Sequence, residues 1–127
     1  MTSKKKVVIV DDDLDLLKIL AFAFKEEGFA IETFSTGKEA LKALTHKGAL
    51  GSISLLILDR MLPDMDGMDI AKALKEKNGS APPILFLSVL SSEKDILKGL
   101  RIGAIDYIAK PFNIDVLLQK AKLLLRK

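Results

Sequence analysis

The chain has 127 residues, of which 49% are hydrophobic and 29% are charged, a balance typical of one soluble globular domain. This composition excludes a disordered chain, and no apolar run approaches the ~20 residues that a membrane helix requires. The net charge is only +3 and the basic residues are dispersed, so we expect no direct nucleic-acid binding by this domain and no contact with a membrane.

The densest basic run, Lys4 to Lys6, stands near the start of the chain. We interpret residues 1–6 as a solvated basic tail and residues 1–127 as a single domain. The basic residues are not followed by the apolar stretch and cleavage site of a secretory signal. The chain has no cysteine, which fits an intracellular protein and excludes thiolate metal sites. We therefore expect a cytoplasmic protein.

Short aliphatic runs alternate with longer segments along the chain. In the longer segments apolar residues recur three and four positions apart and a polar face lies opposite, which predicts amphipathic helices. The runs that we predict as strands are Val7–Val10, Ala30–Phe34, Leu55–Leu58, Ile84–Leu87 and Tyr107–Ile108. The alternation predicts an α/β fold, a parallel five-stranded sheet with helices on both faces. Glycines that we expect as left-handed helix ends follow the first four helical segments: Gly28, Gly48 with Gly51, Gly79 after Asn78, and Gly103.

Polar side chains stand where four of the predicted strands end. Asp11 and Asp12 follow the first strand, Asp59 the third, Ser88 the fourth and Lys110 the fifth. Because ligands of such sheets bind beyond the carboxyl ends of the strands, we expect these groups to converge on one rim. Two carboxylates ~4 Å apart repel by about 4 kcal/mol at an effective dielectric constant of about 20. A hard divalent cation with oxygen ligands, Mg²⁺ above all, would offset that repulsion.

Four motifs, in order and at matching spacing, resemble the receiver domain of bacterial two-component response regulators. They are VVIVDDD, LLILDRMLPDMDG, PILFLS and YIAKPF, and together they span nearly the whole chain. The resemblance implies a flavodoxin-like (βα)5 three-layer sandwich. It also implies transfer of a phosphoryl group from a sensor histidine kinase or histidine phosphotransfer protein, with an output domain or a downstream protein as a further partner.

The same resemblance implies a role for each residue at the rim. Asp59 would be the phosphoacceptor, and Asp12 and Asp59 would ligate Mg²⁺ directly together with the backbone carbonyl of Met61. Asp11 would act mostly through water. Lys110 would bind the phosphoryl group and precede a cis peptide at Pro111.

Two further residues would form the switch that responds to phosphorylation. The resemblance assigns Ser88 as the switch hydroxyl and Tyr107 as the switch aromatic, acting on the face built from the fourth helix, fifth strand and fifth helix. Ordinary strand packing is the alternative for Tyr107, since tyrosine often buries its ring and keeps its hydroxyl wet.

Other polar and aromatic residues have simpler interpretations. Asp13 is expected to cap the first helix, and Ser91 and Ser92 with Glu93 are expected to begin the fourth. His46, the only histidine, is expected to be solvated. Core or helix packing is expected for all six phenylalanines, Phe22, Phe24, Phe29, Phe34, Phe86 and Phe112.

The chain departs from the common receiver pattern at several positions. Met61 and Leu90 stand two places beyond the phosphoacceptor and the switch hydroxyl, where many receivers are polar, and we expect them to exclude the water that hydrolyses the phosphoform. Val89 replaces a small residue and would narrow access for small phosphodonors. Apolar or basic residues replace the acids of one known dimer face, so we expect a monomer or a weak dimer; they are Arg101, Ile105 and Val116.

Two rival functions compete with the signalling module, which would turn over no external substrate. A Mg²⁺-dependent phosphatase with an aspartyl nucleophile would carry a second acid two residues later, where Met61 stands. A constitutive binding module with an idle site would lack an acid, the hydroxyl or the lysine, and none is missing. Nucleotide binding is disfavoured because the chain has neither a GxxxxGK[ST] loop nor a GxGxxG turn.

Overall fold

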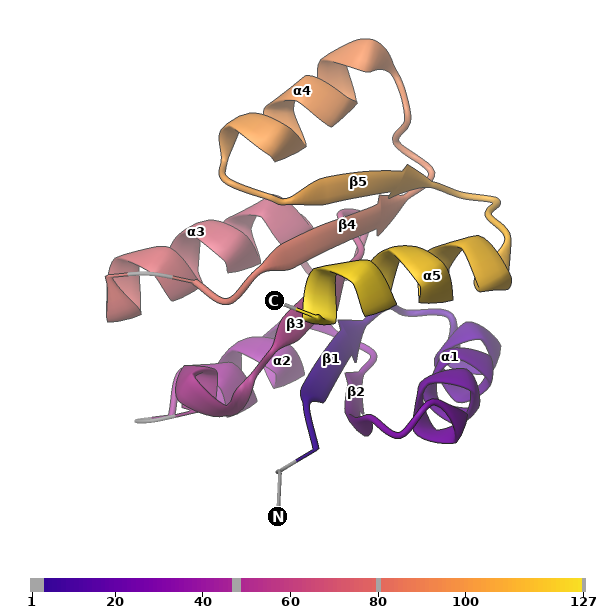
Figure 1. Cartoon of the computed structure of the whole chain (residues 1–127). Helices are drawn as coiled ribbons and strands as arrows, with labels where there is room; N and C mark the ends of the chain where they lie inside the picture. Colours follow the sequence, from indigo (N-terminus) through magenta and orange to yellow (C-terminus); the bar gives the residue numbers. More distant parts are fainter. Residues whose placement is uncertain (1–3, 47–48, 80, 127) are drawn as a thin grey trace.

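Five parallel strands form one sheet in the computed structural model, which describes residues 4–46, 49–79 and 81–126 (Figure 1). The strands are β1 (Lys6–Val10), β2 (Ala30–Phe34), β3 (Leu55–Leu58), β4 (Ile84–Ser88) and β5 (Asp106–Ala109). Their order across the sheet is β2-β1-β3-β4-β5 and every neighbouring pair is parallel. This order is that of a flavodoxin-like fold and confirms the predicted fold class.

Helices follow the strands and cover both faces of the sheet. They are α1 (Leu14–Glu26), α2 (Gly37–Leu44), α3 (Gly67–Asn78), α4 (Glu93–Arg101) and α5 (Ile114–Leu125), with a short 3-10 helix, η1 (Ala49–Ser52), before β3. Helices α1 and α5 lie on one face and α2, α3 and α4 on the other, which gives three layers (Figure 1). None of the helices in the described ranges is long and apolar enough to cross a membrane.

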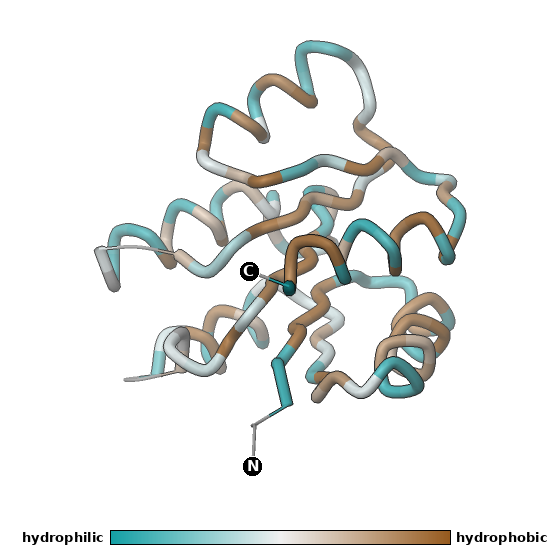
Figure 2. Tube along the Cα trace, viewed as in Figure 1, coloured by the Kyte–Doolittle hydropathy of each residue, from teal (hydrophilic) through white to brown (hydrophobic). Residues whose placement is uncertain are grey.

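Alternate residues of β1, β3 and β4, with Tyr107 of β5, supply two cores, one beneath each helical layer. Figure 2 shows the hydrophobic colour along much of the central strands. The side toward α1 and α5 carries Val7, Ile9, Leu55, Ile57, Leu85 and Leu87. The side toward α2, α3 and α4 carries Val8, Val10, Leu56, Leu58, Phe86 and Tyr107. Because both faces are buried, the strands are continuously apolar, as expected for a parallel sheet.

Polar side chains cap the amino-terminal ends of α1 and α4. Asp13 accepts a hydrogen bond from the Leu16 amide at the start of α1, and Ser92 accepts one from the Asp95 amide at the start of α4. Both caps confirm the sequence prediction. Such caps satisfy amide groups that have no partner inside the helix.

Two predictions at the ends and surfaces of helices are wrong. Gly28, Gly79 and Gly103 have the expected positive φ, but Gly51 does not, because it lies within η1. Gly48 lies outside the described residues. Phe22 does not pack in the core: it is 67% exposed, because its place on α1 turns away from the buried side of that helix.

Lys6 also differs from the expected solvated tail. It is the first residue of β1, aligned with Ala30 of β2. Its ammonium lies 2.9 Å from the Glu32 carboxylate on the neighbouring strand. Strand β1 therefore begins one residue before its aliphatic run, because Lys6 pairs with β2. The cross-strand ion pair with Glu32 stabilises this extra residue of β1.

Candidate functional site

The carboxyl ends of β1, β3, β4 and β5 bring the predicted site residues to one rim of the sheet. Val10 of β1 is aligned with Leu58 of β3, so Asp11 and Asp59 leave the sheet side by side. The Asp59 amide donates a hydrogen bond of 3.0 Å to the Val10 carbonyl and locks this register. The parallel sheet therefore positions both acids through its backbone ladder.

Three carboxylates gather at this rim. Each of Asp11, Asp12 and Asp59 offers an oxygen, and the three oxygens lie within 4.8 Å of one another. Asp11 is 1% exposed and Asp59 is 4% exposed, whereas Asp12 is open to solvent. Two buried acids with a third beside them need positive charge to offset their repulsion.

Lys110 supplies part of that charge. Its Nζ lies 2.6 Å from Asp11 Oδ2 and 2.9 Å from Asp59 Oδ2. Burial lowers the pKa of Lys110, but the hydrogen bonds to Asp11 and Asp59 outweigh burial and raise that pKa overall. Burial raises the pKa of Asp11 above its usual value, although Lys110 opposes the shift. The predicted cis peptide between Lys110 and Pro111 is present.

Backbone groups hold the Asp59 carboxylate and its loop in place. The Met61 amide donates a hydrogen bond of 3.0 Å to Asp59 Oδ1, and the Gly67 amide donates one of 2.8 Å to the Arg60 carbonyl. A Cβ at Gly67 would lie 2.1 Å from the Asp59 carbonyl oxygen. The loop after Asp59 therefore folds back so closely that only glycine fits there.

Ser88 and Tyr107 both bind the backbone of Leu90. The buried Ser88 Oγ accepts a hydrogen bond of 3.2 Å from the Leu90 amide, and the Tyr107 hydroxyl donates to the Leu90 carbonyl. The Tyr107 ring is buried and packs on Phe86, with 5.8 Å between the ring centroids. Packing alone therefore does not describe Tyr107, because its hydroxyl holds the same loop residue that Ser88 holds.

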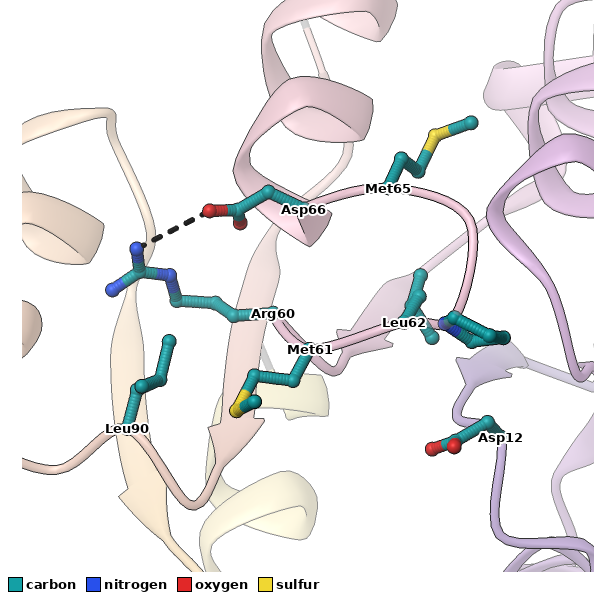
Figure 3. A pocket seen from close by; sticks show the side chains of 8 residues that line it. Asp12, Arg60, Met61, Leu62, Met65, Asp66 and Leu90 are labelled. Carbon is teal, nitrogen blue, oxygen red and sulfur yellow. Dashed lines mark hydrogen bonds and ion pairs between the residues drawn. The ribbon is translucent and has the colours of Figure 1, made fainter.

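A surface cavity of about 430 Å³ opens beside the acids (Figure 3). Apolar side chains make up much of its lining, and Met61 is 50% exposed within it. Figure 3 shows Met61 and Leu90 close to each other on one side of the cavity and Asp12 on another. The lining residues are Asp12, Arg60, Met61, Leu62, Pro63, Met65, Asp66 and Leu90.

The sequence model of one protein family, the response regulator receiver domain, matches residues 7–122 of this chain. This chain belongs to the response regulator receiver family. The receiver is 37% identical over 123 residues to the transcriptional regulatory protein PcoR of Escherichia coli, covering 97% of this chain and 52% of that protein. It is also 37% identical to CpxR of Escherichia coli K12, covering 96% and 50%. The receiver thus spans about half the length of the curated relatives it matches.

Solved receivers share the fold. The beryllium-fluoride-activated receiver domain of DrrB superposes with a TM-score of 0.84 at 32% identity, covering 98% of this chain and 100% of that one. The non-phosphorylated HemR receiver domain of Leptospira biflexa gives 0.87 at 28% identity, covering 98% and 96%.

One residue of the receiver site escaped prediction from the sequence. Arg60 follows Asp59 directly and is only 6% exposed, yet the sequence motif predicts no role for it. Its partners are Asp66 and Asp95, and Asp95 is 35 positions away in the sequence. A charged residue beside a buried strand was the available signal, but the motif does not indicate the distant partner. His46, by contrast, is exposed just after α2, as predicted.

Proposed function

We propose that this receiver is a phosphoacceptor signalling module that takes a phosphoryl group onto Asp59. The donor would be a sensor histidine kinase or a histidine phosphotransfer protein, and Mg²⁺ would be required. The observation that carries the proposal is the cluster around Asp59, where Asp11, Asp12 and Lys110 surround one buried carboxylate. A cytoplasmic location and a single domain over residues 1–127 belong to the same proposal.

The donor groups at the rim suit Mg²⁺. All three side chains are carboxylates, the hard oxygen ligands that Mg²⁺ prefers, and only Asp12 is exposed, which leaves room for retained water. Asp12 and Asp59 would hold the ion with the Met61 backbone carbonyl, and Asp11 would act mostly through water. When bound, the ion would neutralise charge on the transferring phosphoryl group.

The transfer itself asks little more of the protein. An Asp59 oxygen attacks the phosphorus of a phosphorylated imidazole in line with the P–N bond, which breaks while the departing nitrogen takes up a proton. The products are an acyl phosphate and a neutral imidazole. Lys110 already contacts an Asp59 oxygen at 2.9 Å, so its ammonium is placed to pair with an equatorial phosphoryl oxygen.

The response would pass through Leu90. When Ser88 Oγ turns to the phosphoryl group it releases the Leu90 amide, while Tyr107 still holds the Leu90 carbonyl. The loop between β4 and α4 then shifts, and the space that Ser88 Oγ leaves favours the buried position of the Tyr107 ring, so the face formed by α4, β5 and α5 changes. The relatives are named transcriptional regulatory proteins, so an output domain is part of this proposal.

Beryllium fluoride, which forms a phosphoryl-like complex on a carboxylate, tests the proposal through fluorine NMR. We expect bound fluoride resonances for the wild type with Mg²⁺ and none for Asp59→Asn. Asp13→Asn is the matched control and should behave as the wild type, because asparagine also caps a helix. Bound resonances in Asp59→Asn, or none in the wild type, would refute Asp59 as the acceptor.

The residue at position 61 distinguishes the proposed signalling module from a Mg²⁺-dependent phosphatase. Met61 occupies the position where that chemistry places a second acid, and its amide is already used to hold Asp59 Oδ1. We propose that no external substrate is turned over. Repeated release of phosphate from small phosphomonoesters would favour the rival.

A further inference from the structure

Arg60 carries a buried guanidinium that the phosphoryl chemistry does not use. Its Nη2 lies 3.4 Å from Asp66 Oδ2. Figure 3 marks this ion pair with a dashed line. Its Nη1 lies 3.3 Å from the Asp95 carbonyl oxygen and 3.7 Å from Asp95 Oδ1. One side chain thus joins the loop after Asp59 to α4.

Both partners of Arg60 stand at the start of a helix. Asp66 caps α3, since its Oδ1 accepts a hydrogen bond of 2.8 Å from the Met68 amide. Asp95 lies in the first turn of α4, and its Oδ2 accepts one of 2.7 Å from Ser92 Oγ. A helix start is electropositive and would repel a guanidinium, so the two acids are what allow Arg60 to lie between α3 and α4.

Leu90 and α4 connect the contacts of Arg60 to Tyr107. Arg60 and Leu90 line the same cavity, and the Tyr107 hydroxyl donates to the Leu90 carbonyl. On the other side of the ring, a Cβ at Gly99 of α4 would lie 2.8 Å from a Tyr107 ring carbon. Burial lowers the pKa of Arg60, but the Tyr107 hydroxyl and Asp66 outweigh burial and raise it. The ring is therefore enclosed by the helix that Arg60 ties down.

Stability alone does not explain this arginine. Its Nε is buried and has no hydrogen-bond partner in the part of the chain that the structure describes. A buried donor without a partner costs free energy, as does a buried cation whose two ion pairs are longer than 3.3 Å. An apolar side chain of similar length would fill the space without those costs.

We propose that Arg60 is a positioning residue that clamps the first turn of α4 to the loop after Asp59 and so keeps Tyr107 buried. The clamp biases the receiver toward the buried-tyrosine arrangement before any phosphoryl group arrives. That last consequence for signalling rests on the proposed function. The clamp itself does not, because it follows from contacts among Arg60, Asp66 and Asp95.

Tyr107 is the only tyrosine and the chain has no tryptophan, so intrinsic fluorescence reports on this ring alone. We would measure quenching by acrylamide without Mg²⁺, at a temperature where circular dichroism shows a folded chain. Arg60→Met should raise the quenching constant at least about two-fold, because the clamp no longer disfavours exposed-ring states. Arg101→Met, the matched control on the exposed side of α4, should leave it unchanged.

A second variant approaches the same clamp from α4. Asp95→Asn removes the carboxylate 3.7 Å from Nη1 but keeps the backbone carbonyl, so it should raise quenching less than Arg60→Met does. Combining the two changes should give no more quenching than Arg60→Met alone. If Arg60→Met does not fold, Asp95→Asn carries the test alone. A quenching constant equal to that of the wild type in folded Arg60→Met would overturn the proposal, and so would one in Asp95→Asn if Arg60→Met does not fold. An equal rise in Arg101→Met would overturn it as well.

Beryllium fluoride with Mg²⁺ separates the clamp from the signalling function. In Arg60→Met, the bound mimic should return quenching toward the wild-type value, which general loosening of the fold would not do. Quenching that stays high while fluorine NMR shows bound mimic would overturn the proposed bias. Absence of bound mimic in the wild type would instead defeat the proposed function and leave the first measurement valid.

Discussion

A single ammonium, Lys110 Nζ, lies between the buried carboxylates of Asp11 and Asp59, and Asp12 adds a third acid at the surface. One cation among three anions leaves the rim acidic. The strand-end rule predicted the position of each of these residues, because carboxyl ends of neighbouring parallel strands must meet. It could not predict the bond between Tyr107 and Leu90, which depends on how the loop after β4 folds.

The apolar side chains of Met61 and Leu90 should control how long Asp59 stays phosphorylated. Met61 and Leu90 line the cavity next to the acids, and their side chains carry no polar group that could hold an attacking water. The phosphoform of Met61→Asn with Leu90→Glu should therefore decay faster than that of the wild type, by about ten-fold, which corresponds to ~1.4 kcal/mol of barrier. Intact-mass measurements over time would follow the decay.

The matched control for this pair lies away from the acids. Ile19→Asn with Leu123→Glu makes the same kinds of change at exposed positions of α1 and α5 and should decay as the wild type does. An unchanged or slower decay in the Met61 and Leu90 variant would show that these side chains do not control access of water.

Among the elements, α2 depends on a residue far away in sequence. Asp64, in the loop before α3, accepts hydrogen bonds from the Gly37 amide at 2.9 Å and the Lys38 amide at 2.8 Å. These two bonds lower the pKa of Asp64 below its usual value. The loop after the phosphoacceptor thus also stabilises the start of α2.

This contact predicts a pH dependence. Because the folded state lowers the pKa of Asp64, its contribution to stability is present above the usual carboxyl pKa and is lost as the pH falls through the folded-state pKa. Asp64→Asn should lower the melting temperature at neutral pH, and the difference from wild type should vanish in acid. Asp69→Asn, an exposed acid in the first turn of α3, is the comparison. A difference that persists unchanged in acid would contradict this assignment.

Most element positions could be predicted from the sequence because the hydrophobic pattern is strong. Two strands, Ala30–Phe34 and Leu55–Leu58, have the expected bounds. The errors have physical reasons. Phe22 shows that the hydrophobicity of a residue does not fix the side of α1 on which it falls, and Gly51 shows that a glycine can lie inside a helical turn instead of ending one.

For the whole molecule, the face formed by α4, β5 and α5 determines how two copies could pair. Ile105 and Val116 are exposed apolar residues on this face, and Arg101 is an exposed cation. Acids at these positions would be needed for the charged dimer of some DNA-binding response regulators, so we propose that this receiver does not form it. Sedimentation should show no dimer of that kind with or without beryllium fluoride. A mimic-dependent dimer that Val116→Arg abolishes would contradict this.

Phosphorylation of Asp59 is the central claim, and intact mass after incubation with acetyl phosphate and Mg²⁺ tests it most directly. The buried Asp59 carboxylate, 2.9 Å from Lys110 and near Asp12, should accept one phosphoryl group. We predict a mass gain of one phosphoryl for the wild type and none for Asp59→Asn. An equal gain in both proteins, or no gain in the wild type when a histidine kinase is also supplied as donor, would contradict the account.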